Sequence, residues 1–298
     1  MKIKWSLAIV LVSSLWHTGF SQEIKNPFFA TYSIIEGDSV YNTFDGQVKF
    51  LKETGYSAIE MGDPKNFDAK QSALKINSFP GAYFYFMVDA EQPKLDPQLK
   101  IFISKLKGTK TILAPYIKSS SKKFGTESPT PEKDEMVVKL LRELSYWAKK
   151  ENLQVAIYPH FGFYVERTTH ALQLVKQINR KNTGLTFNLC HWLATTAAEE
   201  RGMLKPHLKD LLPYLKMMII SGANDVVSEK EVIWDDYILP LGKGTFDTYG
   251  LVRYAIKTLR FKNPIGVQCY GIKDNKAWLV KHTMDTWKSY KVRMESEQ

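Results

Sequence analysis

Short apolar runs rich in β-forming residues alternate with amphipathic stretches along most of the chain. We count eight such pairs, and turn-favouring residues lie between them. The runs expected as strands are residues 28–34, 57–61, 81–88, 111–116, 154–158, 185–189, 217–221 and 265–270. Eight strand–helix pairs are typical of an α/β fold of the (β/α)8 or TIM barrel type, and they predict a single domain.

The stretches between these runs repeat their apolar residues at helical spacing. In residues 134–151, Val137, Leu141 and Leu144 fall on one stripe, while lysines and glutamates occupy the other faces. The other expected helices are residues 44–54, 69–77, 97–106, 169–179, 207–214, 249–259 and 276–290.

Two longer polar segments, residues 118–133 and 222–245, follow the fourth and seventh strands. In barrel enzymes the site lies at this end of the strands, so we expect these segments to be lids or substrate loops. For the first of them, a plain surface insertion is an equal alternative.

The composition is that of an ordinary folded protein, with 298 residues of which 44% are hydrophobic and 24% charged. It excludes disordered, fibrous and disulfide-scaffold proteins. The formal net charge of +10 raises the question of a nucleic-acid partner. The basic residues are scattered and form no stripe interleaved with aromatics, so we expect a solvated surface and no nucleic acid.

The N-terminal segment has the pattern of a signal peptide. Lys2 and Lys4 precede an apolar run from Trp5 to Trp16, and Gly19 and Ser21 occupy the small-residue positions of a cleavage site. The run has about 12 residues, whereas a bilayer span needs about 20, so no transmembrane segment is expected. We expect residues 1–21 to be removed and residues 22–298 to form the exported, periplasmic or secreted barrel; an uncleaved anchor is the alternative.

An oxidising compartment raises the question whether Cys190 and Cys269 form a disulfide. They belong to the ends of the sixth and eighth strands, which the seventh strand separates by about 10 Å of backbone. A disulfide needs Cα atoms within about 7 Å. The sequence therefore predicts two free cysteines.

Polar side chains gather at the carboxyl ends of the expected strands. The expected rim consists of Glu60, His160, Asn188, His191, Ser221 and Gln268, with Lys243 on the long seventh loop. Tyr158, Trp192 and Tyr270 would provide aromatic walls on which sugars stack. Each of these residues also has an ordinary explanation, as a local hydrogen-bonding group or as core packing. Their clustering favours one cavity that binds a small-molecule carbohydrate.

Five segments carry a resemblance to a known family: GYSAIEMG (55–62), NLQVAIYPH (152–160), GLTFNLCH (184–191), PLGKGTFD (240–247) and PIGVQCYG (264–271). They resemble the xylose isomerase-like barrels, which include sugar epimerases, inositol-catabolism dehydratases and endonuclease IV. The resemblance covers most of the chain after the signal peptide. It implies a TIM barrel that acts on a carbohydrate.

Members of this family typically bind a divalent metal through a Glu, an Asp, a His and a Glu at the ends of strands five to eight. The matching positions here are Tyr158, Asn188, Ser221 and Gln268. Three carboxylates have become neutral, which removes the charge that attracts Mg²⁺ or Mn²⁺. The resemblance therefore does not predict the family's metal site, and the cofactor stays open, with His160 and His191 as candidate ligands of a softer metal.

The first functional hypothesis is an exported isomerase, epimerase or lyase that removes a proton next to a carbonyl of a sugar, such as a 3-keto sugar. His160 or Glu60 would be the base, and His191 and Lys243 would stabilise the enediolate. Asn188, Gln268, Tyr158, Trp192 and Tyr270 would bind the substrate. The second hypothesis is a non-catalytic carbohydrate-binding barrel that has lost the metal site. A nuclease is disfavoured, because the chain has only 6 histidines.

Overall fold

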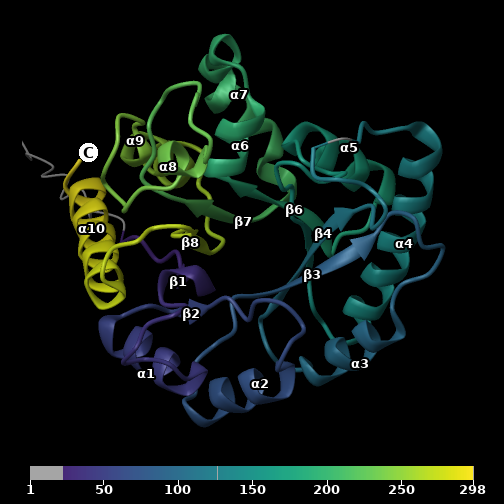
Figure 1. Cartoon of the computed structure of the whole chain (residues 1–298), viewed down its shortest axis with the longest axis horizontal. Coiled ribbons are helices and arrows are strands. Elements are labelled where there is room, and N and C mark those ends of the chain that lie inside the picture. The colour runs from purple at the N-terminus through teal and green to yellow at the C-terminus, as the bar shows by residue number, and fades with distance from the viewer. Residues whose placement is uncertain (1–22, 126, 298) are drawn as a thin grey trace, which may run out of the picture.

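The computed structural model describes residues 23–125 and 127–297, so the expected signal peptide lies outside the described residues. Eight parallel strands curl into a barrel with helices on its outside (Figure 1). The strands are β1 (Phe28–Ala30), β2 (Ala58–Ile59), β3 (Tyr83–Asp89), β4 (Ile112–Lys118), β5 (Val155–Ile157), β6 (Thr183–Asn188), β7 (Leu215–Ile220) and β8 (Ile265–Val267). The expected (β/α)8 architecture is confirmed.

The sheet runs in the order β2-β1-β8-β7-β6-β5-β4-β3. Its two ends meet at a parallel bridge between Ile59 and Gly81. There the Ile59 N–H donates to the Pro80 carbonyl at 3.2 Å, and the Ala82 N–H donates to the Ile59 carbonyl at 2.7 Å. These bonds close the barrel and bring the ends of β2 and β3 together.

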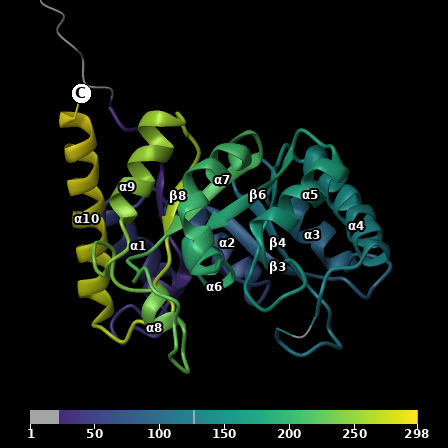
Figure 2. The ribbon, with the colours of Figure 1, turned by 90° about the horizontal axis from the view of Figure 1, so that it is seen from above.

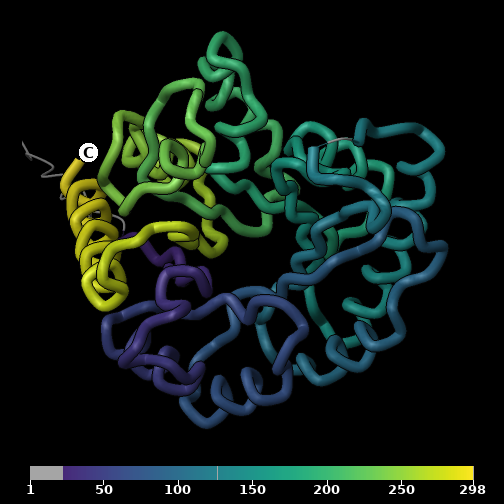
Figure 3. The backbone as a smooth tube through the Cα atoms, viewed as in Figure 1, coloured from purple at the N-terminus to yellow at the C-terminus, as the bar shows by residue number. Residues whose placement is uncertain are grey.

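The helices surround the strands, as the views of Figures 1 and 2 show. They are α1 (Phe44–Thr54), α2 (Phe67–Ile76), α3 (Pro97–Lys105), α4 (Pro131–Lys150), α5 (Thr168–Ile178), α6 (Leu189–Thr195), α7 (Leu204–Leu211), α8 (Trp234–Tyr237), α9 (Thr248–Arg253) and α10 (Lys276–Ser296). The chain makes one circuit, so that α10 packs beside α1 (Figure 3). None of the described helices is long and apolar enough to cross a membrane.

Local signals explain the ends of the best-defined helices. Helix α1 has the predicted bounds: the Thr43 side chain accepts a hydrogen bond from the Gly46 N–H at 3.1 Å, and Gly55 ends the helix at φ 107°. Helix α4 begins three residues before the predicted start, because Thr130 caps it and Pro131 occupies its first turn. Proline is compatible with that position, since its missing N–H would have no partner there.

The apolar core has two layers, which follow from the alternation of side chains along the strands. Inside the barrel lie Phe29, Ala58, Tyr83, Ile112, Ala114, Ala156, Tyr158, Met217 and Ile219. The larger layer, between strands and helices, includes Cys190, Val267 and Cys269. Tyr158 and Ala156 therefore face inward as predicted, and Cys269 faces the helices.

Several expected strands are too long, and the short helices α6 and α8 were not predicted. Strand β8 ends at Val267, because the Gln268 side chain accepts hydrogen bonds from the Cys269 and Tyr270 N–H groups and turns the chain. Strand β1 stops at Ala30 and continues as the 3-10 turn Tyr32–Ile34. After β6 the chain enters α6 at once, with the Asn188 side chain accepting from the Cys190 N–H at 3.3 Å.

The two cysteines are buried and free, as predicted. Both thiols are expected to be unreactive in the folded protein, because burial raises the pKa of each thiol and disfavours the nucleophilic thiolate. Titration with a chromogenic disulfide should detect no thiol in native buffer and two in denaturant. Detection of a Cys190–Cys269 bridge by mass spectrometry would contradict this.

Candidate functional site

A cavity of about 420 Å³ opens at the carboxyl ends of the strands. Side chains that follow β1, β2, β5 and β8, side chains from the first half of β3 and from α6, and side chains from the two long loops form its wall. They are Tyr32, Ser33, Glu36, Glu60, Tyr83, Tyr85, Phe124, Tyr158, His160, His191, Trp234, Ile238, Gln268 and Tyr270. The wall is mostly aromatic and carries two carboxylates and two imidazoles.

Most of the predicted site residues meet in this cavity. Glu60, Tyr158, His160, His191, Gln268 and Tyr270 all line it. Asn188 lies directly behind the wall, where its Nδ2 donates a hydrogen bond to the Tyr158 hydroxyl at 2.7 Å. It acts on the cavity through Tyr158 and does not itself line the cavity.

Three predicted members of the rim lie elsewhere. Trp192 is in helix α6, so it is rotated by about 100° from its neighbour His191 and lines a separate hollow outside the barrel. Lys243 is exposed and lines a different hollow, near α10. The Ser221 hydroxyl donates to the Tyr237 carbonyl at 2.9 Å. We therefore correct the interpretation of Trp192 as a sugar wall and of Lys243 as an enediolate stabiliser.

Several residues of the wall were not predicted from the sequence. Tyr83 and Tyr85 share the inward face of β3, and the alternation of that strand contained the signal for both. Phe124 and Trp234 come from the two long loops, where no periodicity indicates the direction of a side chain. Both loops thus contribute to the site, which favours substrate loops over a surface insertion.

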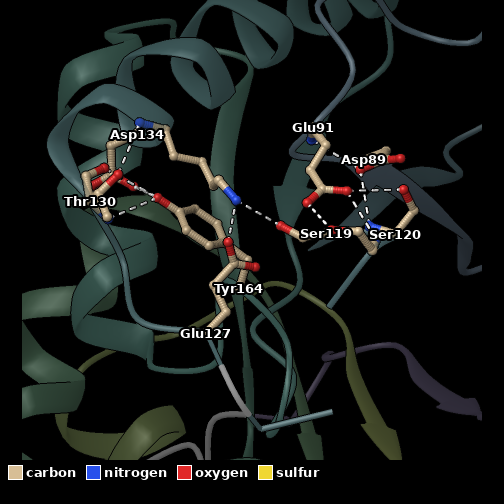
Figure 4. A network of polar contacts seen from close by, with 10 residues as sticks. Asp89, Glu91, Ser119, Ser120, Glu127, Thr130, Asp134 and Tyr164 are labelled. Carbon is tan, nitrogen blue, oxygen red and sulfur yellow. Dashed lines mark hydrogen bonds and ion pairs between the residues drawn. The ribbon is translucent and has the colours of Figure 1, made fainter. Parts of the chain in front are cut away.

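The loop between β4 and α4 is fastened on the side of β3 (Figure 4). Glu91 accepts hydrogen bonds from the Ser120 hydroxyl at 3.2 Å and from the Ser121 N–H at 2.9 Å. Asp89 accepts from the Ser120 N–H at 3.2 Å. These contacts fix the start of the loop to the end of a barrel strand.

A second set of contacts fastens the loop on the side of α4 (Figure 4). The Lys133 ammonium forms an ion pair with Glu127 and donates to the Ser119 hydroxyl at 3.1 Å. Between the two anchors, Phe124 reaches the cavity and packs edge-on against Phe161, with ring centres 5.4 Å apart. Gly162 allows this approach, since a Cβ there would lie 2.1 Å from the Phe124 ring.

Glu60 ends a chain of hydrogen bonds that crosses the cavity floor. Its Oε2 accepts from the Tyr32 N–H at 3.0 Å, and its carboxylate also accepts from the Tyr83 hydroxyl. Tyr83 and Tyr158 are hydrogen-bonded, and Asn188 donates to Tyr158. Because each phenol has one proton, the donors run in one direction, from Asn188 through Tyr158 and Tyr83 to Glu60.

Burial dominates the electrostatics of Glu60. It raises the pKa of this carboxyl group, while the Tyr32 N–H and the Tyr83 hydroxyl act in the opposite direction. A carboxylate in this setting accepts a proton more readily than an exposed one. Glu60 is therefore a carboxyl group of raised basicity that lines the cavity.

The two histidines form a neutral pair on the opposite wall. Their ring centres lie 4.0 Å apart. Burial lowers the pKa of His160 to about 4, and burial together with the adjacent His160 holds the pKa of His191 well below its usual range. The His160 Nδ1 lies 2.9 Å from the Phe161 carbonyl, which only accepts, so Nδ1 carries the proton and Nε2 has the free lone pair.

His191 has the complementary arrangement. Its Nδ1 is buried and has no hydrogen-bond partner within residues 23–125 and 127–297. The tautomer protonated on Nε2 leaves no N–H group buried without an acceptor, and it is therefore favoured. His160 thus presents an acceptor and His191 a donor.

Acidification is expected to destabilise the protein through this pair. The unfolded chain binds a proton on His160 near pH 6.5, whereas the folded chain does so near pH 4. Between these values the unfolded state binds more protons, so the free energy of unfolding falls as the pH falls, by up to about 1.4 kcal/mol per pH unit. Urea unfolding of the wild type and of His160→Gln between pH 7 and pH 4.5 measures the difference, and equal slopes would contradict it.

With this geometry established, the family of the chain is clear. The sequence profile of the family described as xylose isomerase-like TIM barrel matches residues 48–290. The chain belongs to this family. A search among curated proteins finds no matching sequence.

Solved structures with the same fold include several sugar epimerases. The 3-keto-D-glucoside 4-epimerase of E. coli is 13% identical, with a TM-score of 0.62 over 90% of this chain and 100% of the other. The D-allulose 3-epimerase of Methylomonas sp. is 13% identical, with a TM-score of 0.66 over 90% of this chain and 99% of the other. A xylose isomerase-like barrel of Mycobacterium smegmatis, solved with magnesium, is 14% identical, with a TM-score of 0.60 over 89% and 97%.

The residues at the family's metal positions do not fit a divalent cation. The Asn188 Oδ1 accepts from the Cys190 N–H and Sγ, Ser221 donates to a carbonyl, and the Gln268 oxygen accepts from Ser33 and two N–H groups. Their oxygens are thus engaged within the fold. Among the described residues, no group of three or more His, Cys, Asp or Glu side chains is arranged to hold a metal ion.

Proposed function

We propose that the protein is a sugar isomerase or epimerase that removes a proton from the carbon next to a carbonyl group by acid–base chemistry. The observation that carries this proposal is the arrangement of Glu60 and His160 in one aromatic-walled cavity at the carboxyl end of the barrel. Glu60 has a raised pKa, and His160 offers an unprotonated Nε2. Two separate bases on different walls suit a proton that leaves at one position and returns at another.

The reaction needs no oxidant and balances within the site. The C–H bond next to the carbonyl breaks, its proton moves to the base, and its electron pair forms the C=C bond of an enediolate while charge develops on the carbonyl oxygen. Return of a proton to the opposite face of the same carbon gives an epimer. Return to the former carbonyl carbon, with transfer of the neighbouring hydroxyl proton to the former carbonyl oxygen, gives an isomer. The favoured tautomer of His191 directs an N–H donor into the same cavity.

The charge of the cavity favours an uncharged sugar as substrate. Its described lining has two carboxylates, Glu36 and Glu60, and includes no lysine or arginine. A phosphate or carboxylate group on the substrate would face these carboxylates without a cation to balance it. The names of the structural neighbours, which act on allulose and on a 3-keto-glucoside, are consistent with this class.

A non-catalytic carbohydrate-binding barrel is the second candidate. The observation that favours it is the engagement of the former metal positions in internal hydrogen bonds, as for Ser221 with Tyr237. Such a barrel would bind sugars on its aromatic wall without turnover.

Exchange of carbon-bound hydrogen separates the two candidates. The mature chain, kept in EDTA, is incubated in D₂O with methyl 3-keto-glucosides and with ketohexoses, and proton NMR follows the loss of the α-hydrogen signal. An enzyme of the proposed class replaces this hydrogen by deuterium, whether or not the net conversion is favourable. Saturable sugar binding in calorimetry with no exchange on any of these sugars would support the binding protein.

Export of the chain is inferred from its first 21 residues alone. Their basic start, apolar run and small-residue end support removal near Ser21. An uncharged sugar outside the cytoplasm would then be the available substrate. Mass determination of the protein purified from the periplasm or medium of an expressing bacterium tests this, and an intact Met1 in a cytoplasmic protein would contradict it.

A further inference from the structure

Gln268 is held in one defined orientation at the end of β8. Its Oε1 accepts hydrogen bonds from the Ser33 hydroxyl at 2.8 Å, from the Cys269 N–H at 3.0 Å and from the Tyr270 N–H at 3.2 Å. Two of these donors are backbone N–H groups, next to which an amide nitrogen would find no acceptor. The positions of oxygen and nitrogen in this carboxamide are therefore fixed by the backbone.

The nitrogen of the same carboxamide is available to a ligand. Gln268 lines the cavity, and within residues 23–125 and 127–297 its Nε2 donates to no other group. The lining residues include no lysine or arginine, and Lys243 lies outside the cavity. The carboxamide N–H group of Gln268 is thus a preoriented donor in a cavity without a fixed positive charge.

We propose that Gln268 is a catalytic residue whose Nε2 donates a hydrogen bond to the oxyanion of the enediolate. This inference rests on the proposed function and adds to it the group that stabilises the developing charge. The amide proton stays on Gln268, while the electron pair of the broken C–H bond forms the C=C bond and the π pair of the carbonyl group moves onto its oxygen. His191, with its favoured Nε2–H tautomer, is the second donor available to that oxygen.

The arrangement explains why a neutral side chain stands at a position where the family has a metal-binding Glu. A preoriented donor stabilises an oxyanion without reorganisation during the reaction, and loss of one such donor typically costs about 10²–10³-fold in rate. The bonds to Oε1 provide this orientation. A free amide on an exposed side chain would lose much of the effect through rotation.

Gln268→Glu tests the donor with little change of shape. The carboxylate keeps an oxygen where Oε1 accepts its hydrogen bonds, and it replaces the Nε2 donor by an acceptor. Gln154→Glu is the matched control, because Gln154 is exposed before β5 and receives the same charge. Circular dichroism melting verifies that each variant folds. If Gln268→Glu does not fold, Ser33→Ala, which removes the shortest hydrogen bond to Oε1, replaces it.

Binding of two probes in EDTA gives a readout that does not depend on turnover. D-Arabinonohydroxamate carries a planar group that resembles an enediolate, and D-arabinitol is a plain polyol. We expect the hydroxamate Kd to rise about 100-fold in Gln268→Glu, or about 10-fold in Ser33→Ala, with the arabinitol Kd within about threefold of wild type. Gln154→Glu should match the wild type with both probes. Unchanged hydroxamate binding in the variant, or no preference of the wild type for the hydroxamate, would overturn the proposal.

The exchange assay distinguishes this proposal from the proposed function. If the wild type exchanges α-hydrogens and Gln268→Glu does so at the same rate, Gln268 is not the oxyanion donor and the function stands. The opposite outcome is also possible: the wild type binds the hydroxamate more tightly than Gln268→Glu does, but it exchanges no hydrogen on any tested keto-sugar. In that case the proposed function is wrong, and Gln268 is still a hydrogen-bond donor to the enediolate-like group.

Discussion

Replacement of Glu60 by glutamine is expected to slow α-hydrogen exchange by about 10³-fold, within the usual range for loss of a general base. The glutamine oxygen can still accept from the Tyr32 N–H, and the side chain keeps nearly the same shape. What is lost is the carboxylate, which in the wild type is partly buried, has a raised pKa and lines the cavity. Proton NMR in D₂O, with the keto-sugar that the wild type exchanges fastest, measures the rate.

Asp63→Asn provides the matched control for this loss of charge. Asp63 lies three residues further along the same segment, and 65% of its side chain is exposed to solvent. Exchange by this variant should stay within about threefold of the wild type. A Glu60→Gln variant as fast as the wild type would move the base to His160, whose replacement by glutamine would then have to abolish exchange.

The fold could be predicted because its signals are local and repeated. Alternation of β-rich runs and amphipathic helices fixes the barrel, and capping residues such as Thr43 and Gly55 fix the ends of α1. The predicted ends of elements are wrong where a side chain forms hydrogen bonds with backbone N–H groups. The Gln268 side chain ends β8 by accepting hydrogen bonds from two backbone N–H groups, and the Asn188 side chain begins α6 by accepting one. The spacing of hydrophobic residues does not indicate such hydrogen bonds.

The candidate site was predictable where strands position it and unpredictable where loops or helices do. Glu60 and Gln268 directly follow β2 and β8, His160 lies three residues after β5, and all three line the cavity. Trp192 was misplaced because the chain after Asn188 is a helix, in which neighbours point in different directions. Phe124 enters the site only through the anchors of its loop at both ends, which are tertiary contacts.

The hydrogen-bond chain on the cavity floor gives a second expected result. Tyr158→Phe removes the hydroxyl that accepts from Asn188 and is hydrogen-bonded to Tyr83. Tyr83 then loses the donor that polarises it, and it becomes a weaker donor to Glu60. The carboxylate is less stabilised, so the pKa of Glu60 rises further. A hydrogen bond contributes about 1 kcal/mol net, and part of this loss reaches Glu60 through Tyr83. The pKa of Glu60 should therefore rise by about half a unit.

The sign of this shift makes it measurable in the pH dependence of exchange. A general base works in its deprotonated form, so the rate falls on the acidic side as Glu60 takes up a proton. In Tyr158→Phe this acidic limb should move to higher pH by about half a unit, whether or not the maximal rate also changes.

Tyr85→Phe is the control, because Tyr85 lies on the same wall, with its ring centre 5.0 Å from that of Tyr158, and is outside the chain of hydrogen bonds that leads to Glu60. A merely structural role of Tyr158 would lower the rate and leave the limb in place. An unmoved limb in Tyr158→Phe, or an equal shift in Tyr85→Phe, would therefore show that Glu60 is tuned by burial and not through the tyrosines.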